Sequence, residues 1–184
     1  MKNFLITLVI ILIPVKSFGL IEVDITRGNL NPLPIAVSPL STDEEARQNF
    51  ESILKKKNIG SEISSIVEDN LKVSGLFNPL NKDAFLQEPD IANLKPRFED
   101  WNLIKAQALI TGKVSYVEEK LRVEFRLWDV LAGKEMMALA FTTVPNNWRR
   151  VGHIITDKVY ERLTGERGYF DTRIIYVAEE GPKT

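Results

Sequence analysis

The stretch of residues 108–141 constrains the fold of this sequence more than any other part. Apolar side chains occupy alternate positions in three successive runs, which is the period of a strand with one buried face. Turns at residues 118–120 and 132–134 separate the runs, and Gly133 can adopt the positive φ that tight hairpins use. The pattern predicts a three-stranded antiparallel meander with one face buried and the other in water.

An amphipathic helix is expected to precede this meander. Apolar side chains recur at three- and four-residue steps from Ile59 to Leu71, with Ser61 as the expected N-cap. Gly75 stands where a left-handed residue commonly ends a helix. The helix therefore has one apolar stripe that can pack on the sheet.

The last long helix is expected to begin at Asn146 or Asn147 and to end at Gly165. Its apolar side is formed by Trp148, Val151, Ile155, Val159 and Leu163. A shorter helix is expected to carry three apolar side chains on one face, namely Phe98, Trp101 and Ile104. Together with the meander, these helices predict an α+β domain with two or three helices packed on one face of a mostly antiparallel or mixed sheet.

The remaining segments give weaker patterns. Residues 35–40 are predicted to form a short strand closed by Pro39, and residues 77–80 to return to the core in an extended form. Residues 41–58 are highly charged and fit a helical period poorly, which leaves a loop or a short solvated helix. Residues 89–96 begin and end with proline and are expected to be a linker.

Residues 1–19 have the features of a cleavable secretory signal. Lys2 supplies a positive start, residues 4–13 are almost wholly apolar, and Ser17 and Gly19 place small residues at the two positions that a signal peptidase inspects. The alternative is a membrane anchor, but about ten apolar residues span only roughly 15 Å as a helix, half of a hydrocarbon core. We therefore expect cleavage after Gly19 and a mature protein in the periplasm of a bacterium.

Composition excludes several classes of function. The chain has 184 residues, of which 44% are hydrophobic and 27% charged, as in a folded domain. Its formal net charge is −1, so it has no overall attraction for nucleic acid or anionic lipid. The absence of cysteine excludes disulfides, thiolate catalysis, cysteine-type zinc sites and a lipid anchor on cysteine.

The sequence contains few candidates for catalysis. His153, its one histidine, stands four residues before Asp157 on the predicted last helix, where the two could act as a base and its orienting carboxylate. A hydrolase would also need a nucleophile, and no G-x-S-x-G turn is present. A packing or capping histidine is the simpler interpretation. We expect no enzyme activity, no metal and no cofactor, with a cryptic hydrolase or a small-ligand-binding module as alternatives.

An alternating apolar and polar segment follows the expected cleavage site directly. Residues 21–26 have the strand period, and residues 28–31 form a flexible connection to the rest of the chain. Such a segment can add to the edge of a sheet, either that of a partner or that of its own domain.

Four stretches of the sequence resemble the TolB family. Residues 34–40 (PIAVSPL) are similar to its PI-x-V-x-PF strand, and residues 66–80 to its I-V-x-x-D-L-x-x-S-G-x-F-x-P-L helix and exit, with Asn70 in place of the usual acid. Residues 148–157 are similar to its R-x-x-(A/G)-H-x-x-(A/S)-D helix. Residues 159–177 resemble the junction where the β-propeller of the family starts.

This resemblance implies a periplasmic adaptor without catalytic activity in the Tol-Pal envelope system. The system maintains outer-membrane integrity, constricts the envelope at cell division and is exploited for bacteriocin import. TolB proteins bind the lipoprotein Pal mainly through the propeller and the inner-membrane protein TolA through the mature N-terminal segment. By the resemblance, the TolA-binding residues here are Leu20, Ile21, Glu22, Val23, Asp24, Ile25, Thr26 and Arg27.

The resemblance also divides the chain. Residues 1–19 are the expected signal peptide, residues 20–168 the α+β domain, and residues 169–184 the junction with a propeller. Because the sequence stops where propeller repeats should begin, we expect a truncated chain, a split gene or a fragment that lacks the Pal-binding surface. Without a propeller, the strand-like run at residues 174–177 is expected to be exposed and prone to aggregation.

Overall fold

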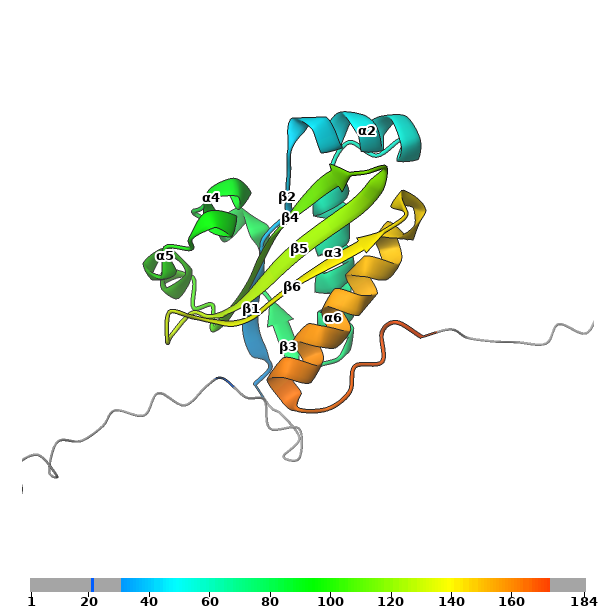
Figure 1. The fold of residues 1–184 in the computed structure, drawn as a ribbon. Helices are drawn as coiled ribbons and strands as arrows, with labels where there is room; N and C mark the ends of the chain where they lie inside the picture. The colour runs from blue at the N-terminus through cyan, green and yellow to red at the C-terminus, as the bar shows by residue number, and fades with distance from the viewer. Residues whose placement is uncertain (1–20, 22–30, 173–184) are drawn as a thin grey trace, which may run out of the picture.

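The computed structural model describes residue 21 and residues 31–172 (Figure 1). Four of the expectations above therefore lie wholly or mostly outside the described residues. They are the signal peptide at 1–19, the strand at 21–26 apart from its first residue, the connection at 28–31 apart from its last residue, and the strand at 174–177.

The described part contains one mixed sheet. The strands are β1 (Leu33–Val37), β2 (Ser41–Thr42), β3 (Phe77–Pro79), β4 (Ala108–Val117), β5 (Lys120–Asp129) and β6 (Lys134–Thr143). The strand order is β3-β1-β4-β5-β6, and β2 pairs with β4 farther along the strand than β1 does. Strands β4, β5 and β6 form the predicted antiparallel meander, whereas β1, β2 and β3 pair in parallel.

Five α-helices accompany the sheet in the described part of the chain. They are α2 (Glu44–Leu54), α3 (Ile59–Val73), α4 (Pro89–Leu94), α5 (Phe98–Leu103) and α6 (Trp148–Thr164), with 3₁₀ turns η1 (Lys82–Ala84) and η2 (Pro145–Asn147). Helices α3 and α6 lie side by side against one face of the sheet, whereas α4 and α5 lie on its other side (Figure 1). The predicted α+β class is confirmed.

The main core lies between the sheet and the helix pair α3 and α6. Alternate residues of β5, including Val123, Phe125 and Leu127, are buried there together with Val151, Ile155 and Val159 of α6. The strand period and the helix period thus place their apolar rows in the same layer, as the sequence predicted.

A second, smaller core lies on the opposite face of the sheet. Ala36 and Leu109 have the opposite parity to the main-core residues of β1 and β4, and they pack with Trp101 of α5. The indole N–H of Trp101 donates to the side-chain oxygen of buried Gln87 at 3.0 Å. The Gln87 amide in turn donates to the Asp100 carboxylate at 3.2 Å, which fastens α5 to the segment before α4.

Several local predictions need correction. Helix α3 begins at Ile59 with Asn58 as N-cap, so the cap expected at Ser61 is wrong. Residues 89–96 are not merely a linker, because α4 starts at Pro89, a residue type that suits the first helical position. The charged stretch 41–58 contains β2 and α2, so the helical alternative is the correct one and the loop is not. Gly75 and Gly165 both have positive φ, as predicted.

Close contact between α3 and the β1–β2 connection explains the residues at the start of this helix. A Cβ atom on Gly60 would collide with the carbonyl oxygen of Leu40. The Ser64 hydroxyl, one turn later, accepts a hydrogen bond from the Leu40 N–H at 2.9 Å and lies 3.1 Å from the Ser38 carbonyl. The Ser64 hydroxyl therefore supplies the Leu40 N–H with the acceptor that a neighbouring strand would otherwise provide.

Candidate partner-binding site

The predicted partner-binding residues begin beside the folded domain. Ile21 is half-buried and packs against the main core. Leu20 and residues 22–27 lie outside the described part of the chain. The structure thus places one member of the predicted segment on the domain surface and describes no contact of the others.

A second feature near a chain end is the attachment of residues 168–171 to α6. The Asp157 carboxylate accepts hydrogen bonds from the backbone N–H groups of Phe170 at 2.7 Å and Asp171 at 3.0 Å. The Arg150 guanidinium binds the Asp171 carboxylate through both Nε and Nη2 at 3.0 Å. This two-pronged ion pair raises the pKa of Arg150 above its ordinary range.

Aromatic packing reinforces that attachment. Tyr160 of α6 makes edge-on contacts with Phe77 of β3 and with both Tyr169 and Phe170. Burial raises the pKa of the Tyr160 phenol, with smaller contributions from Tyr169 and Glu166. The chain therefore leaves the domain along a defined path over α6. Sequence reasoning missed this path, although Gly168 beside an aromatic pair was a possible signal.

His153 and Asp157, the candidate pair for a hydrolase, have separate partners. The Nδ1 atom of His153 lies 2.9 Å from the Asn70 amide nitrogen of α3, and the same amide donates to Thr156 at 3.1 Å. Asp157 is occupied by backbone N–H groups of the C-terminal segment. No hydrogen bond joins the two side chains, although both are described. Their arrangement holds α3, α6 and the exit segment together and provides no base and nucleophile.

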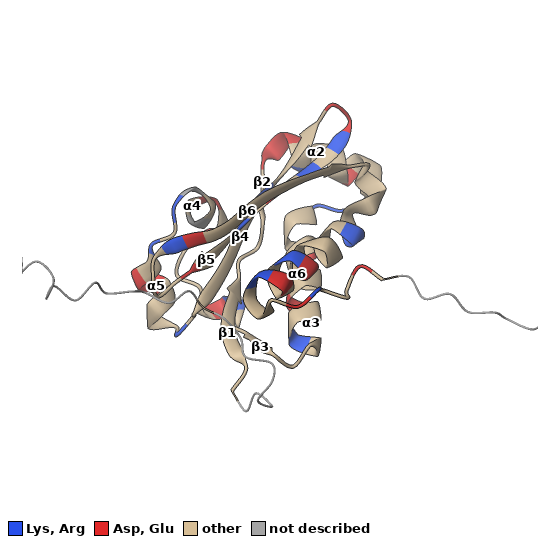
Figure 2. Ribbon diagram, turned by 60° about the horizontal axis from the view of Figure 1, so that its bottom comes forward, with Lys and Arg blue, Asp and Glu red and all other residues tan. Residues whose placement is uncertain are grey.

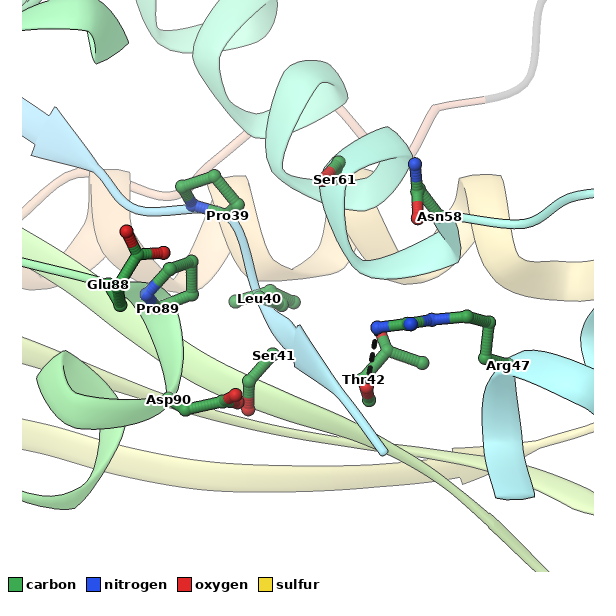
Figure 3. Close-up of a pocket in the computed structure, with 10 residues that line it drawn as sticks. All are labelled: Pro39, Leu40, Ser41, Thr42, Arg47, Asn58, Ser61, Glu88, Pro89 and Asp90. Carbon is green, nitrogen blue, oxygen red and sulfur yellow. Dashed lines mark hydrogen bonds between the residues drawn. The ribbon is translucent and has the colours of Figure 1, made fainter. Parts of the chain in front are cut away.

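A hollow of about 230 Å³ opens where β2 meets the starts of α2, α3 and α4 (Figure 3). Glu88 and Asp90 lie on one side of it and Arg47 on the other. The Arg47 guanidinium donates to the Glu44 carboxylate at 3.1 Å and to the Thr42 carbonyl at 3.5 Å, so its charge is already engaged. The hollow is lined mostly by polar side chains, and its lining contains no histidine or cysteine.

Several charges elsewhere are paired with neighbouring side chains. Acidic and basic residues are interspersed on α2 and α6 (Figure 2). Pairs such as Lys82–Glu68 at 2.7 Å and Arg122–Glu124 at 2.8 Å join neighbouring side chains. No group of three or more histidine, cysteine or acidic side chains within residue 21 and residues 31–172 is placed to hold a metal ion.

A helix that crosses a bilayer must be long and apolar enough to span its hydrocarbon core. None of the helices in the described ranges could span a membrane.

Comparisons with known proteins agree with one another. The profile of the TolB amino-terminal domain matches residues 21–136. The Tol-Pal system protein TolB of Pelagibacter ubique (strain HTCC1062) is 82% identical over 174 residues, which is 95% of this chain and 39% of that protein. The crystal structure of TolB from Acinetobacter baumannii superimposes with a TM-score of 0.60 at 21% identity, over 77% of this chain and 30% of that one.

These matches have two consequences. The chain spans well under half the length of both relatives, and the crystal structure supports the fold alone because its identity is low. The family profile, in contrast, covers more than half of the chain, including β1 to β5 and the helices between them. The chain belongs to the TolB amino-terminal domain family.

Proposed function

We propose that this chain works in the bacterial periplasm as the adaptor domain of the Tol-Pal system. The observation that carries the proposal is the 82% identity with a Tol-Pal TolB across 95% of the chain. At that identity the surface as well as the core is largely shared, so a common partner is the simplest inference. Export requires that residues 1–19 act as the cleaved signal that their pattern predicts.

The proposed partner is a TolA-like inner-membrane protein, and the proposed contact is the segment from Leu20 to Arg27. Its alternating pattern suits addition to a sheet edge, in which backbone groups supply hydrogen bonds and every second side chain supplies specificity. Ile21 is the one described residue of this segment, and its packing against the main core supports a contact beside the domain. Residues 20–168 form the adaptor domain in this account and residues 169–184 the junction beyond it.

Binding of a Pal-like lipoprotein belongs, in this proposal, to the part of the relatives that lies beyond the matched 39%. Through the TolA contact, the domain would support outer-membrane integrity and envelope constriction at division, and it would be open to exploitation in bacteriocin import. The proposal involves no catalysis. The separate engagement of His153 and Asp157 supports that part of it, because neither group is poised to act on a substrate.

A pull-down with the periplasmic domain of TolA tests the proposal. The chain that begins at Leu20 should retain TolA, and a chain that begins at Asn29 should lose it while still unfolding in one cooperative transition, slightly lowered by the loss of the Ile21 contact. A His153→Ala variant of the longer chain is the matched control and should bind normally. Equal retention by the two chains would contradict the proposed contact.

A further inference from the structure

The two edges of the sheet are protected very differently. At one edge, β3 has three residues and ends in Pro79, which has no N–H to offer to another strand. At the other edge, β6 has ten residues and pairs only with β5 among the described strands. Proteins usually shorten, charge or cover such long edges, because unpaired backbone groups attract other strands.

The usual protective features are confined to the beginning of β6. Lys134 and Glu135 are its charged residues, and Glu135 forms an ion pair with Arg126 at 3.4 Å. A register shift next to Leu127 bends the pairing there, and Arg162 of α6 donates to the Met136 carbonyl at 3.4 Å. From Met137 to Thr143 the strand contains no charge and no proline.

The register identifies which backbone groups of β6 have no partner strand among the residues that the structure describes. In β4, the Ile110 carbonyl accepts from the Ser38 N–H at 3.0 Å, so the backbone groups of this residue point towards β1 and those of Thr111 towards β5. Thr111 is opposite Arg126, so the backbone N–H and C=O groups of Arg126 point back to β4. Those of Phe125 and Leu127 therefore point to β6.

Carried one strand farther, the same alternation reaches the edge. Leu139 is opposite Phe125, so its backbone groups point to β5. The residues between these paired positions consequently present their N–H and C=O groups to the open side. These residues are Ala138, Ala140 and Thr142, all of which are exposed.

The side chains along this edge also favour a strand as the ligand. Ala138 and Ala140 are small and stand on the face away from α6, so they leave room for any side chain beside them. On the other face, Met137 and Phe141 are half-buried against the main core, and Leu139 is 37% exposed. The side chains of an added strand would continue this apolar row. A charged side chain of that strand would lose its hydration there without gaining an ionic partner.

We propose that the β6 edge from Ala138 to Thr142 is a docking site for an extended segment of a partner protein. The side chains of this segment that lie on the same face of the sheet as α6 would be uncharged and apolar. The site is distinct from the N-terminal segment and does not depend on it. Here the domain would receive a strand, whereas at residues 20–27 it would donate one. The backbone groups of Ala138, Ala140 and Thr142 would supply the hydrogen bonds.

Amide hydrogen exchange followed by NMR tests this proposal, with an acetylated and amidated peptide of alternating valine and threonine as the probe. In the free chain, the amides of Leu139 and Phe141 should be protected and those of Ala138, Ala140 and Thr142 should exchange rapidly. At saturating peptide, the latter three should slow by at least about tenfold. Slow exchange of these three in the free monomer would mean that the edge is already paired and would overturn the proposal.

Two variants and two modified peptides complete the test. Ala140→Pro removes an outward-facing N–H without breaking the β5–β6 ladder, so the chain should fold and lose the peptide, whereas Ala140→Val should retain it. Only one edge of the bound peptide faces β6, so only every second peptide N–H can bond to it. N-methylation of those residues should abolish binding, and N-methylation of the residues between them should not. Equal effects of both sets, or concentration-dependent dimers that protect the same amides without peptide, would refute the proposed occupant.

Discussion

The carboxylate of Asp157 accepts a hydrogen bond from the backbone N–H of Phe170 at 2.7 Å, thirteen residues farther along the chain. The same carboxylate binds the next N–H, that of Asp171, so a single side chain of α6 holds two consecutive peptide groups of the exit segment. Asp171 adds its own ion pair with Arg150. The direction in which the chain leaves the domain is therefore set by α6.

Removal of that carboxylate should loosen the exit segment. Asp157→Ala leaves two backbone N–H groups without their acceptor, which is expected to lower the free energy of unfolding by about 1–3 kcal/mol. Cleavage by trypsin after Arg167 should become faster at the same time. Urea denaturation and limited proteolysis measure the two effects. Lys158→Ala on the same helix removes only an exposed ion pair and should change neither by much.

Gly168 should tolerate no side chain. A Cβ atom at this position would overlap the backbone and the carboxylate of Asp157, so Gly168→Ala must displace the segment from α6. We expect a loss of about 1–3 kcal/mol in thermal or urea unfolding. Gly75→Ala is the comparison, because no atom would lie within 4 Å of the added Cβ and only the positive φ of this residue opposes the substitution. That variant should lose about 1 kcal/mol, and a larger loss than at Gly168 would contradict the contact.

Ser64 should matter more for stability than its neighbour Ser65. Ser64→Ala removes the acceptor of the buried Leu40 N–H and is expected to lower the free energy of unfolding by about 1–3 kcal/mol. Ser65 donates to the carbonyl of Ser61 within α3 and accepts a bond from Lys82, both partly buried. Ser65→Ala should therefore change stability by less than about 1 kcal/mol. Parallel urea titrations compare the pair, and equal losses would show that the Leu40 contact is unimportant.

Stability should fall at alkaline pH in part because of Tyr160. Burial raises the pKa of its phenol above the ordinary 10.0, so the folded state keeps the proton to higher pH than the unfolded state does. Its contribution is complete below pH 10 and is lost as the pH rises from there through the folded-state pKa. Tyr160→Phe should show a shallower decline in the free energy of urea unfolding as the pH rises above about 10, the ordinary pKa of the phenol. An unchanged slope would contradict the assignment.

Strong periodic patterns in the sequence predicted the central architecture. The three runs of the meander, the apolar stripe of α6 and the glycine caps at Gly75 and Gly165 appear where their patterns placed them. In each case a local rule and the burial of one face favour the same structure. The β1 and β3 segments were also recognised as extended, but their parallel pairing depends on partners distant in sequence.

The misses have equally specific causes. Helix α4 has six residues, too few to show a helical period, and its proline at the first position was interpreted as a sign of a linker. The roles of Asp157 and Gln87 depend on contacts with residues ten or more positions away, which no local pattern encodes. Of the predicted partner-binding residues, Ile21 alone is described, so their role remains a prediction.

The proposed function depends most on the proposed backbone contact between residues 20–27 and TolA. Isothermal titration of the TolA periplasmic domain with a Val23→Pro, Thr26→Pro double variant tests it most directly, since these two residues point their N–H groups to opposite edges of a strand and one of the two edges must face TolA. We predict that the affinity of this variant falls at least about tenfold while a Val23→Thr, Ile25→Thr variant keeps more of it. Undiminished affinity in the proline variant would contradict the account.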